Sequence, residues 1–154
     1  MSGRPWGSRN LLEAQIEVEV AFHECDPLGV TWHGHYLGYL ESARSALLNS
    51  IGYNFRQMTV SGFAWPIVDL RVKYVKSTTF GQRLTVRAAL EEYENRLKIA
   101  YTVADSASGE VVTKASTTQV AVVQGRGEMC FVSPQIFLDK VRAALAAADG
   151  RRAS

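Results

Sequence analysis

Residues 23 to 36 read HECDPLGVTWHGHY and form a polar stretch between two segments of different periodicity. All three histidines of the chain lie in this stretch, together with one of its two cysteines and the carboxylates Glu24 and Asp26. The pairs Asp26-Pro27 and Leu28-Gly29 are typical of turns. The stretch therefore predicts a polar loop.

The segments on either side predict a strand and then a helix. Before the loop, Ile16, Val18, Val20 and Phe22 alternate with other residues, as in a half-buried strand. After it, apolar residues recur every three or four positions from about 34 to 51, and Gly52 supplies a helix stop. The helix is rich in glycine, serine and alanine, so we expect it to be central, mostly buried and closely packed on a sheet.

The rest of the chain predicts a meander. Period-two alternation returns in four segments, at 68–74, 84–90, 97–103 and 111–123, separated by short breaks that suit antiparallel neighbours. A bridging stretch at 53–62 precedes them, and Pro134 opens a final amphipathic helix at roughly 134–148. The prediction is an α+β fold in which a five-stranded antiparallel sheet wraps around a long central helix. We expect one domain over residues 1–154, with its core at about 14–145.

Composition excludes several classes of function. The chain has 17 basic and 15 acidic residues, and the scattered basic residues build no face for nucleic acid. No window approaches the run of about 18 apolar residues that a membrane span needs. The N-terminus MSGRPWGSRN has no apolar segment behind it, which argues against an export signal. We therefore expect a cytoplasmic protein in which Cys25 and Cys130 are reduced.

The polar loop has three interpretations on its residues alone. His33 and His35, with His23, Cys25 and Asp26 nearby, offer zinc ligands, although no established zinc spacing accompanies them. The same residues also suit an ordinary turn with packed histidines and an inert thiol. In the third interpretation, the Asp26 carboxylate faces the free N–H groups at the start of the helix. That pairing suits acyl transfer or hydrolysis, with a carboxylate as base or nucleophile and an amide as oxyanion stabiliser.

The run from Asp26 to Tyr36 resembles the active-site signature of hotdog-fold thioesterases. It is most similar to the branch that contains 4-hydroxybenzoyl-CoA thioesterase, and residues 39–44 resemble the helix of that family. The resemblance spans about residues 14–145. It implies hydrolysis of an acyl-CoA or acyl-carrier-protein thioester by a homodimer or homotetramer, with no metal or organic cofactor. The alternative is a dehydratase-like relative, using His33 and Glu41, or a protein that only binds acyl thioesters.

The resemblance also implies roles for individual residues. Asp26 matches the catalytic carboxylate, and His33 matches the position whose backbone N–H points at the thioester carbonyl. The expected substrate-binding residues are Gly34 and Tyr36 at the helix mouth, Glu41 on the helix, and Ser77 and Thr78 at a strand end that reaches the site from the partner subunit. An ordinary ion pair with Arg44 is the alternative role for Glu41.

Overall fold

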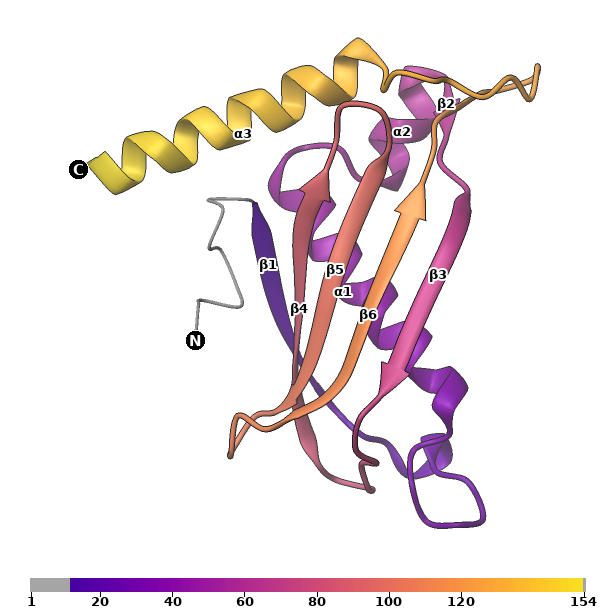
Figure 1. Cartoon of the computed structure of the whole chain (residues 1–154), viewed down its shortest axis with the longest axis vertical. Helices are drawn as coiled ribbons and strands as arrows, with labels where there is room; N and C mark the ends of the chain where they lie inside the picture. Colours follow the sequence, from indigo (N-terminus) through magenta and orange to yellow (C-terminus); the bar gives the residue numbers. More distant parts are fainter. Residues whose placement is uncertain (1–11, 154) are drawn as a thin grey trace.

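In the computed structural model, which describes residues 12–153, a long helix lies across one face of a twisted antiparallel sheet (Figure 1). The helix is α1 (Tyr36–Ser50). The sheet order is β1-β4-β5-β6-β3, with bounds β1 (Glu13–Glu19), β3 (Ile67–Tyr74), β4 (Arg83–Glu92), β5 (Leu97–Asp105) and β6 (Val111–Gln119). This arrangement confirms the predicted α+β class and the five-stranded antiparallel sheet.

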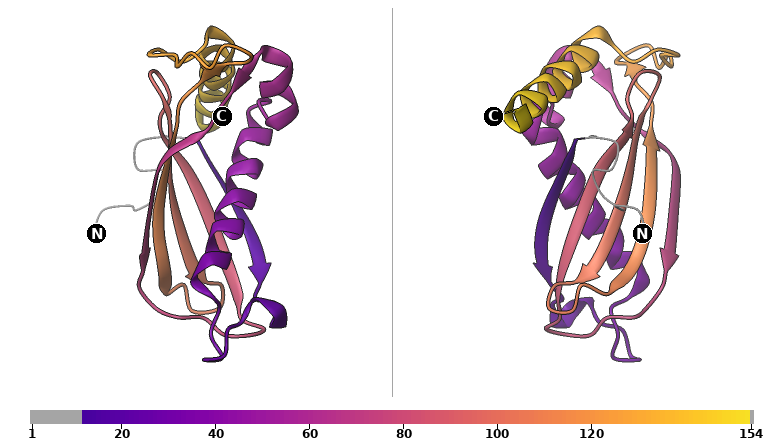
Figure 2. Two further views of the ribbon diagram at one scale, coloured as in Figure 1. Left: turned by 90° about the vertical axis from the view of Figure 1, so that its right-hand side faces the viewer. Right: turned by 60° about the vertical axis from the view of Figure 1, so that its left-hand side comes forward.

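The core lies between α1 and the central strands. Alternate residues of β4 and β5 are fully buried, among them Val86 and Ile99, and the apolar residues of α1 pack onto them. Figure 2 shows α1 running along this face, and within residues 12–153 no helix covers the opposite face of the sheet. Gly52 ends the helix as predicted: its φ is 75°, and the Tyr53 N–H donates to the Leu48 carbonyl over 3.0 Å.

One end of the sheet is closed by short elements that periodicity did not reveal. They are α2 (Phe55–Ser61), β2 (Phe63–Ala64) and β7 (Val122–Val123), with β2 and β7 paired in a small second sheet. The final helix, α3 (Gln135–Ala153), extends further than predicted and crosses this end (Figure 1). It is attached through Phe137, whose ring centroid lies 5.6 Å from that of Tyr53 and 4.9 Å from that of Trp65.

The first strand ends earlier than its alternation suggested. The predicted strand included Phe22, but that residue begins a short 3-10 helix, η1 (Phe22–Glu24), and is 76% exposed. The Glu24 carboxylate accepts a hydrogen bond from the Ala21 N–H over 2.8 Å, which turns the chain out of the sheet. The predicted helix start is also divided, because η2 (His33–His35) precedes α1.

The sequence predicted that the chain has neither a membrane span nor an export signal. Among residues 12–153, no helix is both long and apolar enough to cross a membrane. The expectation that the N-terminal decapeptide carries no export signal concerns residues outside those described.

Candidate active site

Asp26 is held in a tight turn that leaves half of its carboxylate free. Its N–H donates to the Val30 carbonyl, and its carbonyl accepts from Gly29, each over 2.9 Å. Gly29 has a φ of 81°, a conformation that glycine adopts without strain. The Leu28 N–H donates to Asp26 Oδ1 over 2.9 Å, whereas Oδ2 accepts no hydrogen bond from any residue between 12 and 153. Asp26 therefore presents a fixed carboxylate with one oxygen available for chemistry.

A chain of buried hydroxyls fixes the loop against the sheet and against α1. Thr78 Oγ1 shares hydrogen bonds of 2.7 Å with both Thr31 Oγ1 and the Tyr36 hydroxyl. The Thr31 N–H also donates to the Thr78 carbonyl over 2.8 Å. Thr78 is fully buried, so its hydroxyl supports the loop.

Within one chain, the segment of Ser77 and Thr78 lies beside the loop of its own chain, and a β-bridge between Val30 and Thr79 continues the pairing. The contact across a subunit boundary that the sequence predicted for these two residues stays a prediction. Of the two predicted residues, Ser77 lines the pocket with Asp26, whereas Thr78 does not.

Glu24 ties the other side of the loop to α1. Its Oε1 accepts hydrogen bonds from the Ala21 N–H and from the Tyr39 hydroxyl, over 2.8 and 2.7 Å, and its carbonyl accepts from the Trp32 N–H. Burial by itself raises the pKa of Glu24, but these bonds and the nearby His35 and His23 lower it below its usual value. Burial and the Glu24 carboxylate raise the pKa of Tyr39.

The short helix η2, which leads directly into α1, begins at His33. The His33 carbonyl accepts a hydrogen bond, whereas its N–H has no partner in the described range. The Tyr74 hydroxyl donates to the His33 carbonyl over 2.8 Å. No residue in the described range accepts a hydrogen bond from the His33 N–H, as is usual in the first turn of a helix. A Cβ at Gly34 would overlap the ring of Trp32, so a larger residue here would force that half-exposed ring to move.

Asp26 and His33 line one pocket of about 250 Å³. Tyr36 and Ser77, also predicted from the sequence, contribute to it, whereas Gly34 does not. The remaining lining residues are Val30, Thr31, Tyr74, Val75 and Lys76. Sequence reasoning missed Tyr74 and Lys76, because only the tertiary fold brings the end of β3 to the start of α1.

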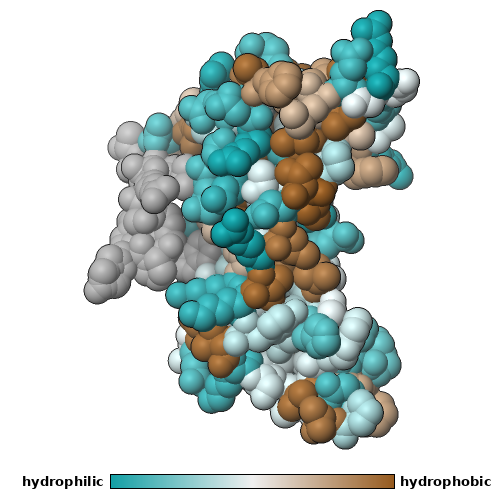
Figure 3. Space-filling model, turned by 45° about the vertical axis from the view of Figure 1, so that its right-hand side comes forward, coloured by the Kyte–Doolittle hydropathy of each residue, from teal (hydrophilic) through white to brown (hydrophobic). Residues whose placement is uncertain are grey.

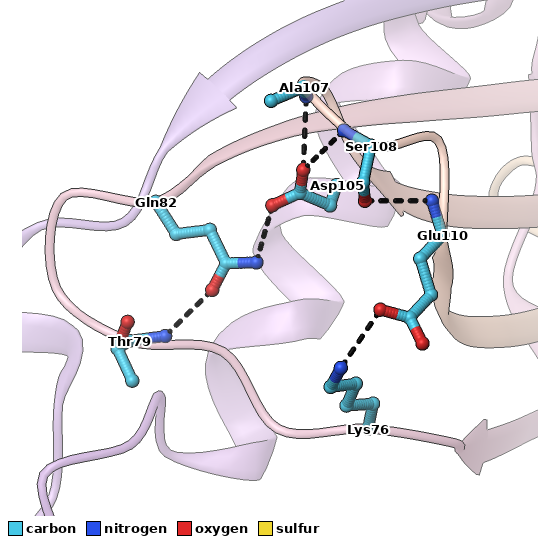
Figure 4. Close-up of polar contacts among 7 residues, drawn as sticks. All are labelled: Lys76, Thr79, Gln82, Asp105, Ala107, Ser108 and Glu110. Carbon is cyan, nitrogen blue, oxygen red and sulfur yellow. Dashed lines mark hydrogen bonds and ion pairs between the residues drawn. The ribbon is translucent and has the colours of Figure 1, made fainter.

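The segment after β3 is fixed by a polar network at this end of the sheet (Figure 4). Lys76 pairs with Glu110 over 2.8 Å, and Gln82 links the Thr79 N–H to the Asp105 carboxylate, over 3.0 and 2.7 Å. Backbone N–H groups of Ser108 and Ala107 and the Gln82 amide lower the pKa of Asp105. The pocket wall that includes Lys76 and Ser77 is therefore attached to the β5–β6 turn.

Glu41 lies outside this pocket. It lines a separate pocket of about 770 Å³ and makes the alternative contact expected from its spacing, an ion pair of 3.7 Å with Arg44. Within one chain, the structure therefore does not bring Glu41 to Asp26.

The zinc interpretation finds no cluster of ligands. Within residues 12–153, no group of three or more His, Cys, Asp or Glu side chains is placed to hold a metal. The His33 and His35 rings pack against Trp32, with centroids 5.0 and 5.4 Å away. Cys25 and Cys130 are both free.

Known proteins share both the sequence and the architecture. The thioesterase-like superfamily matches residues 20–145. A Bacillus subtilis protein named "Putative acyl-CoA thioesterase YneP" is 31% identical over 107 residues, covering 69% of this chain and 77% of that protein. The solved DHNA-CoA thioesterase of Staphylococcus aureus superimposes with a TM-score of 0.72 at 25% identity, covering 90% of this chain and 89% of that one.

A further solved structure supports the fold. The 4-hydroxybenzoyl-CoA thioesterase of Pseudomonas sp. strain CBS-3 has a TM-score of 0.72 at 19% identity, and the match covers 83% of this chain and 98% of that one. With the superfamily matched over most of its length, the chain belongs to the thioesterase-like superfamily and is a hotdog-fold thioester hydrolase.

Proposed function

We propose that the Asp26 pocket hydrolyses acyl-CoA or acyl-carrier-protein thioesters. The observation that carries this proposal is that Asp26 and His33 line the same pocket. Asp26 has a carboxylate oxygen that accepts no hydrogen bond, and the His33 N–H, at the start of η2, has no acceptor among residues 12–153. A carboxylate either activates water as a general base or is itself the nucleophile, and a helix N-terminus stabilises developing negative charge. The name of the Bacillus relative supports CoA as the acyl carrier.

Hydrolysis at this site needs only these two groups and water. As a general base, Asp26 Oδ2 takes a proton from water while the hydroxide attacks the thioester carbon. The His33 N–H donates to the resulting oxyanion, the C–S bond breaks, and the thiolate recovers the proton. As a nucleophile, Asp26 Oδ2 attacks the thioester carbon, the C–S bond breaks, and the thiol leaves, which gives a mixed anhydride. Water then cleaves the anhydride, releases the carboxylic acid and restores the Asp26 carboxylate.

We propose further that the protein is at least a homodimer joined through β3. This strand is the last of the sheet, and its Ile67, Val68, Leu70 and Tyr74 are 43–58% exposed. Figure 3 shows hydrophobic side chains running in a band along this side of the molecule. An open, apolar edge strand is a template for pairing with a second chain, and two-fold symmetry is the common solution.

The exposed face of α1 fits the same arrangement. The sequence analysis predicted a mostly buried helix, but in the single chain Gly38, Ser42, Ser45 and Asn49 form an exposed row of small and polar residues. Small side chains let a second helix approach closely. A two-fold dimer would cover this row and β3 together, and a tetramer of such dimers is compatible with it.

We also propose a cytoplasmic location, where thiols stay reduced. Both cysteines, Cys25 and Cys130, are free.

A turnover assay tests the reaction. Purified protein is incubated with acyl-CoAs of graded chain length and with benzoyl-type CoAs, and thiol release is measured. We expect release above the uncatalysed rate with at least one of them. A 3-hydroxyacyl-CoA is followed in parallel for loss of water. Water loss without thiol release would identify a dehydratase, and binding without either product would identify an acyl-thioester-binding protein.

A further inference from the structure

The second pocket, of about 770 Å³, lies between α1, α2 and β2 and carries an excess of positive charge. Its charged lining residues are Arg44 and Arg56 against Glu41, so two cations face one carboxylate. Its walls also include Leu48, Met58 and Trp65, all of them buried apolar residues. A site of this composition suits a ligand with an apolar body and an anionic end.

Arg44 is the cation placed deepest in this pocket. Its side chain is 15% exposed, and its one carboxylate neighbour in the described part of the chain, Glu41, is 3.7 Å away and 72% exposed. A strong charge-assisted hydrogen bond is about 2.7–2.9 Å long. Arg44 also lies beside the Tyr101 hydroxyl, but a guanidinium has five N–H donors. Most of its donor capacity is therefore available to a ligand.

Two other residues of the pocket add hydrogen-bonding capacity. Arg56 makes no ion pair with any residue in the described range. Gln119 donates to the Trp65 carbonyl over 2.7 Å, which fixes its amide, yet its buried Oε1 has no partner among residues 12–153. This oxygen only accepts hydrogen bonds and so does not bind a carboxylate, which leaves Arg44 and Arg56 as the cationic donors of the pocket.

The proposed dimer brings this pocket to the active site of the other chain. Tyr74, at one end of β3, lines the Asp26 pocket. Ile67, at the other end, pairs with Gln119, which lines the second pocket. The two ends of the strand are about 23 Å apart. Antiparallel pairing of two copies of β3 about their midpoint places Tyr74 beside the partner's Ile67. The partner's Gln119 is then two strand spacings, about 10 Å, from Tyr74.

We propose that the partner's Arg44 binds a carboxylate at the far end of the acyl group, so that the preferred substrates are thioesters of short dicarboxylic acids. This inference rests on the proposed function and on the two-fold pairing of β3. A carboxylate accepts two parallel hydrogen bonds from one guanidinium, which fixes both its position and its orientation. A phosphate of CoA is the other anion that Arg44 could bind. The CoA phosphates are multiply charged and strongly hydrated, so the apolar walls beside Arg44 suit them less than a single carboxylate.

Two acyl groups of the same shape test the charge recognition. Glutaryl-CoA carries the carboxylate, and 5-methylhexanoyl-CoA replaces both of its oxygens by methyl groups. We expect wild-type kcat/KM to favour glutaryl-CoA, and Arg44→Gln to lower it on glutaryl-CoA by about 10–100-fold, with a loss at least tenfold smaller on the isostere. Arg44→Lys should restore part of the preference. The control is Arg142→Gln, on the exposed surface of α3, which should change neither value.

Several outcomes would overturn the inference. If the wild-type enzyme hydrolyses the isostere as well as glutaryl-CoA, the carboxylate preference is refuted while the proposed thioesterase function stands. Equal losses on both acyl groups would give Arg44 a structural role. Wild type and Arg44→Gln are also compared on N-acetylcysteamine thioesters, which lack the nucleotide and its phosphates. If Arg44→Gln lowers kcat/KM only on the CoA thioesters, Arg44 binds a CoA phosphate and not the acyl carboxylate.

Mixed dimers test whether the pocket acts across the subunit boundary. Asp26→Asn and Arg44→Gln chains are mixed in equal amounts until subunits have exchanged. Half of the dimers are then mixed, and each contains one site with both residues intact. Glutaryl-CoA hydrolysis should rise to about a quarter of the wild-type rate. If no recovery follows proven exchange, Arg44 acts within its own chain and the inference is wrong.

Discussion

Thr78 shows how one residue organises the candidate site. Its hydroxyl joins the Asp26 loop, through Thr31, to the first turn of α1, through Tyr36. The sequence placed Ser77 and Thr78 together as substrate contacts. In an extended segment, successive side chains point in opposite directions, so one of the two faces the pocket while the other is buried behind it. The sequence alone did not show which of the two residues lines the pocket.

We expect Thr78→Val to destabilise the fold by about 1–3 kcal/mol. The buried Tyr36 hydroxyl loses its partner, and the Thr31 hydroxyl keeps only its bond of 3.3 Å to the Thr78 carbonyl. The measurement is the free energy of unfolding in urea. Thr79→Val is the matched control, since Thr79 is exposed and should change stability little. Equal stability of the Thr78 variant and the wild type would show that the hydroxyl chain contributes nothing.

His33→Ala should reduce kcat less than Asp26→Asn, because the backbone N–H survives the substitution. The imidazole packs against Trp32 and is exposed, so its loss leaves the turn intact. Thiol release under saturating substrate compares the two variants. An equal loss in both, with folded protein, would mean that the imidazole itself transfers a proton and would favour dehydration.

The spacing of apolar residues in the sequence identified most of the long helices and strands. The helix α1 and the strands β1, β4, β5 and β6 were predicted because their apolar residues face one shared core. The strand β3 was predicted from its alternation alone, since its residues are mostly exposed in one chain. The sequence predicted one strand over residues 111–123, but the structure divides it into β6 and β7 after Gln119, whose side-chain amide donates to the Trp65 carbonyl. That division depends on a distant residue. The helix α2 did carry a local signal, the Asn54-x-x-Gln57 capping box.

The link between η1 and α1 should make stability depend on pH. Because the pKa of Glu24 is lowered in the folded protein, its carboxylate stabilises the fold above the ordinary glutamate pKa, and this contribution is lost as the pH falls through the lowered value. Glu24→Gln should therefore cost about 1 kcal/mol near neutral pH and less in acid. Unfolding free energies at several pH values check this. The control is Glu13→Gln, since Glu13 is exposed and its side chain has no partner in the described part of the chain. A cost that does not change with pH would contradict it.

For the whole molecule, the main unexplained feature of one chain is the exposure of β3 on both faces. The alternation of this strand predicted a buried face, which the proposed dimer would supply. We expect light scattering at micromolar concentration to give a particle of at least twice 17.0 kDa. Leu70→Lys should weaken the assembly and lower activity with it, whereas Val60→Lys, at an equally apolar but distant exposed position on α2, should not. A fully active particle of one chain would contradict this.

The central claim is that the Asp26 carboxylate performs the chemistry, and the turnover of Asp26→Asn measures it most directly. Asparagine retains the acceptor for the Leu28 N–H, so the turn and the melting temperature should be preserved. We predict that kcat for thiol release falls by about 10²–10⁴-fold, while Asp139→Asn on α3 leaves it unchanged. A folded Asp26→Asn variant that keeps more than about a tenth of the wild-type kcat would show that another group performs the hydrolysis.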